Sequence, residues 1–196
     1  MMWHFARCDA TGTPLLGNGD GREVKVGETL TIDGEPVLCR HGLHASARVL
    51  DALQYCNYDA CLCEVELGGT VVCGDDKSSA TERTVMHMLD CEQTDALLRE
   101  FARHCALTVA HLWDMPEEVR QYLETGDESL MESAYFAAHS ATYFAARNAA
   151  HSAAYFAAES AAESAAHSAA YSAAYSAAWG EQAAWLEARA NEFMNI

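Results

Sequence analysis

Eight cysteines are the side chains of this sequence best suited to chemistry, either as thiolate nucleophiles or as ligands of a soft metal ion. Cys61 and Cys63 flank one leucine in an apolar, strand-like segment, so their side chains point to the same face. Zinc sites are typically marked by closely spaced cysteine pairs such as CxxC, and the sequence contains no CxxC pair. We therefore predict no metal site, and cysteines that serve as small buried hydrophobic residues with free thiols.

The most specific pattern in the sequence is a four-residue repeat. Eleven consecutive tetrads run from Ala137 to Gly180, and two alanines open every tetrad except the second, ATYF. The third place holds histidine, tyrosine, glutamate, arginine or tryptophan, and the fourth is most often serine. Such regularity predicts one repeating structural unit. The tetrad histidines His139, His151 and His167 could bind a metal ion across helices or respond to pH, but we interpret them as polar spacers.

The tetrads predict a helix, because alanine has the highest helix propensity and no proline interrupts the run. Since one helical turn takes about 3.6 residues, each tetrad overshoots by about 40°, and the alanines form a stripe that winds to the right. Neighbouring helices are expected to pack along this stripe in a right-handed sense. Four other interpretations stay open: a helix locally unwound toward the wider π form, a helix folded back on residues 91–124, a solenoid with short sides, and a disordered tail of low complexity.

A helix of this composition is expected to associate with copies of itself. Stripes of alanine and aromatic residues with few charges typically mark an association surface, and identical repeats match one another in register. The protein is therefore its own predicted partner, in a homo-oligomer or a filament. The predicted contact residues are the aromatic side chains of the tetrads: Tyr143, Phe144, Tyr155, Phe156, Tyr171, Tyr175 and Trp179.

Hydrophobic patterning outside the tetrads predicts an α+β fold. Short apolar or alternating segments favour strands over 2–7, 23–32, 60–67, 70–73 and 82–89, with a helix over about 46–55. The Gly68-Gly69 pair is expected to interrupt the strand over 60–73. We predict three domains: a small mixed α/β head over 1–90, a helical connector over 91–132, and a long alanine-rich tetrad-repeat helix over 133–196.

The charge of the chain excludes two classes of partner. With 12 basic and 29 acidic side chains the net charge is −17, which disfavours binding to nucleic-acid phosphates and to anionic lipid. No run of about 18 apolar residues predicts a membrane span. The first four residues, Met1 to His4, show no basic region before an apolar run, so we expect no secretory signal and a cytoplasmic location.

The whole sequence resembles an uncharacterised family of short proteins from tailed phages and their bacterial hosts. The motifs that carry this resemblance are GLHAS at 42–46, EVELGG at 64–69, DDK at 75–77, ERTV at 82–85 and YLETGDESL at 122–130, followed by an alanine-rich repeat. The resemblance implies a phage setting, in the host cytoplasm or in the virion, and no known activity.

Residues 3–90 also resemble the ADP-ribosyltransferase core of the poly(ADP-ribose) polymerase kind. Trp3-His4-Phe5 resembles a strand that carries a histidine in that family, and GLHAS, Gln54-Tyr55-Cys56 and the strand over 63–68 follow in the family's order. The resemblance implies NAD as cofactor and His4, His44 and Glu82 as catalytic residues. His44 stands where the family has a tyrosine, and Phe5-Ala6 replaces a Gly-Ser pair.

Two functions are therefore expected from the sequence. The first is a phage-related structural protein that assembles through its tetrads and needs no cofactor. The alternative is an NAD-binding enzyme of the ADP-ribosyltransferase kind, active or degenerate, carried by the head.

Overall fold

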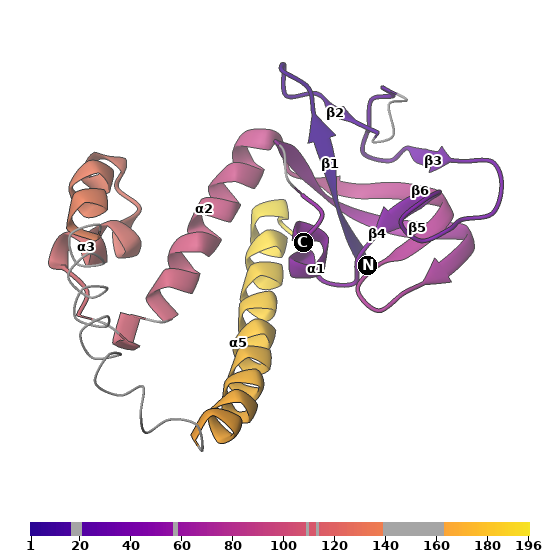
Figure 1. The fold of residues 1–196 in the computed structure, drawn as a ribbon. Helices are drawn as coiled ribbons and strands as arrows, with labels where there is room; N and C mark the ends of the chain where they lie inside the picture. The colour runs from indigo at the N-terminus through magenta and orange to yellow at the C-terminus, as the bar shows by residue number, and fades with distance from the viewer. Residues whose placement is uncertain (17–20, 57–58, 109, 113, 139–162) are drawn as a thin grey trace. The chain divides into compact units, whose positions relative to one another are not determined.

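A computed structural model describes the chain except for residues 17–20, 57–58, 109, 113 and 139–162 (Figure 1). The chain divides into two compact units. The first contains residues 1–98 and 181–196, and the second contains residues 99–180.

The first unit is built on a curled antiparallel sheet (Figure 1). Its strands lie in the order β2-β1-β5-β6-β3, and β4 also pairs with β6. β5 and β6 form a long hairpin that carries most of the pairing, and β1 lies against the other edge of β5. The strands are β1 (Met2–Cys8), β2 (Pro14–Leu15), β3 (Thr29–Thr31), β4 (Leu43–Ala45), β5 (Ala60–Cys73) and β6 (Ser78–Met88).

The two faces of this sheet follow from side-chain alternation along the strands. One face holds a buried cluster that includes Ala6, Leu30, Leu43, Val65 and Val85. Trp3 and Phe5, which alternate with Ala6 on β1, belong to the opposite face and are also buried. The short helix α1 (Val49–Leu53) contacts β1, so it helps to cover that second face.

Helix α2 (Cys91–Thr108) follows β6 after Leu89 and Asp90 and begins with a reciprocal cap. The carboxylate of Asp90 accepts a hydrogen bond of 2.8 Å from the backbone N–H of Gln93, and the side-chain oxygen of Gln93 accepts one of 3.1 Å from the N–H of Asp90. This capping box satisfies backbone donors that the first turn leaves without partners and fixes where the helix starts. Cys91 is thereby held at the end of the sheet.

The second unit is helical in its described residues. It contains η1 (Ala110–Leu112), α3 (Glu117–Thr125), η2 (Glu128–Leu130) and a helical stretch over 131–138. Gly126 ends α3 with a left-handed φ of 68°, a common helix terminator. Met115, Val119 and Ala134 form its small buried cluster.

The prediction of one long alanine-rich helix with right-handed packing is wrong. The fold is mixed α/β with a curled antiparallel sheet and mostly short helices, and the C-terminal helix α5 (Glu163–Met194) follows residues 139–162, which lie outside the described part of the chain. The side chains of α5 are described only from Trp179 onward, where Ala183, Leu186 and Ala190 are almost fully buried in the first unit.

The sequence after the last tetrad explains why the end of α5 packs within the chain. Beyond Gly180 the four-residue period stops, and apolar residues recur at 183, 186 and 190, which is the spacing of one helix face. This face packs inside the chain's own first unit. None of the described helices is long and apolar enough to cross a membrane.

Candidate functional site

A pocket of about 560 Å³ lies in the first unit, beside β1, β4 and the end of α1. Its volume is within the range of about 300–1,000 Å³ that is typical of small-molecule sites. Both predicted histidines, His4 on β1 and His44 on β4, line it. The other lining residues are Trp3, Phe5, Cys39, Arg40, Gly42, Ala45, Ser46, Ala52, Tyr55 and Lys77.

His4 is held as a neutral imidazole. Burial lowers the pKa of His4 well below its ordinary value, and the nearby charges of Arg83 and His44 lower it further. Among the described residues no hydrogen bond to the His4 ring is found, although the ring lines the pocket. A neutral ring of this kind can donate one hydrogen bond and accept another, so His4 is suited to a polar ligand group.

His44 is fixed by the backbone around it. Its Nε2 accepts a hydrogen bond of 3.2 Å from the backbone N–H of Cys39, and the ring also bonds to the backbone of Gly42. Burial lowers the pKa of His44, and Lys77 and Arg83 lower it further. The loop before β4 thus holds the His44 ring, so His44 shapes that wall of the pocket.

Gly42 brings this loop against β6. Its φ is +130°, and a Cβ added there would lie 2.0 Å from the Oγ of Ser79. That hydroxyl donates a hydrogen bond of 3.1 Å to the backbone carbonyl of His41. The position therefore requires a glycine, for its backbone conformation and for its close approach to the neighbouring strand.

Two cationic side chains lie at the pocket, Arg40 from the loop and Lys77 from the turn before β6. The Nζ of Lys77 sits 3.6 Å above the ring of Tyr55, whose hydroxyl donates a hydrogen bond to Asp76. Among the described lining residues there is no carboxylate. The chain as a whole has a net charge of −17, whereas the charged side chains that line this pocket are positive. The pocket therefore favours an anionic ligand.

A third cation, Arg83, lies buried beneath the pocket, with 2% of its surface exposed. Its Nη1 donates a hydrogen bond of 2.8 Å to the backbone carbonyl of His44. Arg83 also lowers the pKa of both His4 and His44, which places its charge close to the two rings.

Glu82, the third predicted catalytic residue, lies elsewhere. It is the β6 neighbour of Arg83, so its side chain leaves the sheet on the opposite face. It is exposed, and its carboxylate approaches Gly68 and Gly69 of β5. The structure thus brings His4 and His44 to one pocket and leaves Glu82 outside its lining.

Most of the predicted self-association residues cannot be placed. Tyr143, Phe144, Tyr155 and Phe156 lie outside the described residues, and Tyr171 and Tyr175 belong to the part of α5 whose side chains are not described. Trp179 is partly buried.

Sequence reasoning missed the cations of the pocket. Lys77 is the last residue of the DDK motif, which the resemblance singled out, and Arg40 stands two residues before the GLHAS motif. No periodic signal marks them, because both belong to loops whose position depends on the strands around them.

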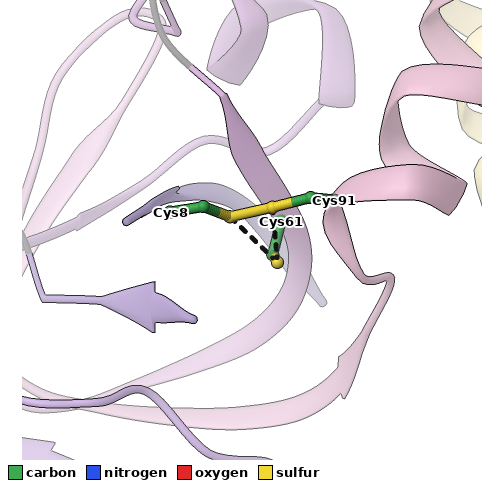
Figure 2. Close-up of side chains that lie close together, drawn as sticks. All are labelled: Cys8, Cys61 and Cys91. Atoms are coloured by element: carbon green, nitrogen blue, oxygen red, sulfur yellow. Dashed lines mark hydrogen bonds between the residues drawn. A yellow bond between two sulfur atoms is a disulfide. The ribbon is translucent and has the colours of Figure 1, made fainter. Parts of the chain in front are cut away.

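The expectation of free thiols is wrong for two cysteines. Cys8 and Cys91 are joined by a disulfide, and the Sγ of Cys61 lies 3.3 Å from that of Cys8 and 3.6 Å from that of Cys91 (Figure 2). Burial raises the pKa of Cys61 to about 11 and that of Cys63 to about 12. Cys61 and Cys63 are buried hydrophobic residues, as predicted, whereas the prediction of burial is wrong for Cys39 and Cys73, which are exposed.

Residues 18–97 match a family model described as a domain of unknown function, DUF7666. No curated protein and no solved structure matches the chain. The matched segment includes Arg40, His44, Tyr55 and Lys77 of the pocket but not His4. The match names neither a phage family nor an ADP-ribosyltransferase family.

Proposed function

We propose that the pocket between β1, β4 and α1 binds an anionic nucleotide-type ligand, with NAD or its ADP-ribose part as the first candidate. The observation that carries this proposal is the convergence of two histidines and two cations on one cavity of about 560 Å³ in a strongly acidic chain. The resemblance of residues 3–90 to ADP-ribosyltransferases supplies the choice of NAD among nucleotides.

Each part of the pocket suits a different part of such a ligand. Lys77 and Arg40 are suited to phosphate oxygens, because charge-assisted hydrogen bonds to phosphate are among the strongest in proteins. The neutral ring of His4 is suited to a ribose hydroxyl or an amide. His44 and Gly42 hold the wall against which the ligand would lie.

We propose that the pocket binds NAD and that Glu82 does not catalyse transfer of the ADP-ribose part. A transferase needs a carboxylate at the reacting ribose to stabilise the developing positive charge, and Glu82 lies on the far face of β6. We therefore expect NAD to bind and a Glu82→Gln variant to bind it as well as the unaltered protein does. Release of nicotinamide that depends on Glu82 would contradict this part of the proposal.

Calorimetric titration of the full chain with NAD, ADP-ribose, AMP and nicotinamide tests the proposal. We expect saturable binding of NAD and ADP-ribose, and a loss of about 10- to 100-fold in affinity in Lys77→Ala, as for a hydrogen bond to a charged group. Lys25→Ala is the matched control, since Lys25 is an exposed lysine of the same unit that pairs with Glu23 at 3.0 Å. Absence of binding by all four compounds would overturn the proposal.

A second candidate, self-assembly, is favoured by a different observation. Met131, Tyr135 and Phe136 are 51%, 64% and 61% exposed on the helical stretch that leads into the tetrads. Large apolar side chains this exposed on one short helix are typical of an association surface. We propose a second copy of this chain as the partner, because the tetrads that follow offer identical surfaces in both copies.

A further inference from the structure

Three cysteines that are far apart in the sequence meet at one end of the sheet (Figure 2). Cys8 is the last residue of β1, Cys61 lies on the adjacent strand β5, and Cys91 is the first residue of α2. Strand pairing fixes the positions of Cys8 and Cys61, since Ala6 of β1 is paired with Cys61. The capping box at Asp90 fixes the third. All three sulfur atoms lie within 4.8 Å of one another.

We propose that this cluster, when reduced, binds one thiophilic metal ion of the Zn²⁺ type through the thiolates of Cys8, Cys61 and Cys91. Sulfur ligands of a tetrahedral zinc ion lie about 2.3 Å from the metal and therefore about 3.8 Å from one another. The two separations from Cys61, 3.3 Å and 3.6 Å, are shorter than that value by about half an ångström or less. The Cα atoms of Cys8 and Cys91 lie 7.1 Å apart, which leaves room for an ion between the two sulfurs once they are reduced.

The surroundings of the cluster favour a cation. A second cavity of about 320 Å³ adjoins Cys91, and three carboxylate side chains, those of Asp59, Glu92 and Asp95, line it. These groups lower the electrostatic energy of a divalent ion near the cluster, and the cavity gives it an entry path. It also has room for a water molecule as the fourth ligand, since three protein ligands leave one tetrahedral position open.

The disulfide and the metal ion exclude each other. In the disulfide form Cys61 is the one member of the three-cysteine cluster that keeps a thiol, and one sulfur ligand does not hold the ion. Reduction by a phosphine breaks the Cys8–Cys91 bond, converts the two sulfurs to thiols and yields the phosphine oxide, with water as the source of oxygen and protons. Metal binding then displaces the three thiol protons into solvent.

The test is a metal titration of the full chain, with and without phosphine reduction. We expect the reduced protein to take up one Zn²⁺ per chain in competition with a chromophoric chelator, and Cd²⁺ to give a sulfur-to-metal charge-transfer band. The disulfide form should give neither signal. Cys61→Ser should abolish the band, and Cys73→Ser, which alters an exposed cysteine at the other end of β5, should leave it unchanged.

Alkylation of the reduced, unaltered protein followed by peptide mapping makes the test independent of variant folding. We expect Zn²⁺ to protect Cys8, Cys61 and Cys91, and to leave the exposed Cys39 and Cys73 reactive. The proposal is overturned if reduced protein shows no metal-dependent band, or if protection falls on cysteines outside the cluster.

Discussion

The buried guanidinium of Arg83 donates a hydrogen bond of 2.8 Å to the backbone carbonyl of His44, and its charge lowers the pKa of both His44 and His4. One side chain thus supports the pocket wall and adds to the effect of burial, which is the largest cause of the lowered pKa of both histidines. In the sequence Arg83 is only a residue of the ERTV motif, and nothing in its spacing identifies this role.

Replacing Arg83 by methionine is expected to raise the pKa of His4 and of His44. Removing a nearby positive charge stabilises the protonated ring, but burial remains and is the larger cause for both residues. Both pKa values should therefore move toward the ordinary value without reaching it. Titration of the imidazole signals by NMR measures this, and unchanged signals in a folded Arg83→Met protein would contradict our account.

His4 is expected to make the protein less stable at acid pH. Its pKa is lowered in the folded state, so below about pH 6.5 the unfolded state takes up a proton that the folded state does not. Stability should fall by up to about 1.4 kcal/mol for each pH unit below that point, until His4 is also protonated in the folded state.

Urea unfolding between pH 7.5 and 5 measures the effect of His4. The His4→Gln variant should lose the part of the pH dependence of stability that comes from His4. If the stability of the His4→Gln variant falls with pH as steeply as that of the unaltered protein, His4 is not the group responsible.

Replacing Gly42 by alanine is expected to destabilise the fold and to distort the pocket. The new Cβ would lie 2.0 Å from the Oγ of Ser79, at a φ of +130°. We expect a loss of about 1–3 kcal/mol in the free energy of unfolding, as for overpacking and backbone strain. Gly27→Ala is the matched control, because Gly27 has a φ of +80° with nothing within 4 Å. Equal losses in the two variants would exclude the steric contact as the cause.

Leu186 tests whether α5 stabilises the first unit. Its side chain is fully buried, so Leu186→Ala should cost about 2–5 kcal/mol, the usual range for a buried leucine. Glu181→Ala alters an exposed residue of the same helix and should be neutral within about 0.5 kcal/mol. Thermal unfolding of both variants measures the difference, and a neutral Leu186→Ala would mean that α5 does not pack on the first unit in solution.

Substitution of Tyr135 and Phe136 by serine tests self-assembly. We expect the unaltered chain to scatter light as an oligomer at micromolar concentration and the double variant to shift toward the monomer. Val71 and Val72, which are 42% and 37% exposed on β5, provide a matched control when both are replaced by serine. A monomeric unaltered chain would remove the support for this candidate function.

The strands could be predicted from the sequence to a large extent. The apolar and alternating segments at 2–7 and 60–67 correspond to β1 and β5, since both follow the two-residue period of a sheet. The predicted break at Gly68-Gly69 is wrong, because β5 continues to Cys73. Gly69 has a φ of +65°, and a register shift there absorbs the glycines as a bulge, with the N–H of Thr70 bonded to Thr81 at 2.9 Å.

The candidate site could be predicted only in part. The resemblance to the ADP-ribosyltransferase core predicts His4 and His44 as site residues, and the two line one pocket. Glu82 is predicted only from the resemblance, as the glutamate on a later strand, and the alternation of β6 turns it to the opposite face. The place of Lys77 in the pocket and the Cys8–Cys91 disulfide both depend on contacts between segments that are distant in the sequence. Cys8 and Cys91 are 83 residues apart, and no local sequence pattern encodes such contacts.

The central claim is that the pocket of His4 binds a nucleotide, and NMR of the imidazole signals during a titration with NAD tests it most directly. We predict a saturable shift of the His4 signal, assigned by its absence in His4→Gln, with no shift of the exposed His111. A His4 signal that stays unchanged up to millimolar NAD and ADP-ribose would contradict the claim.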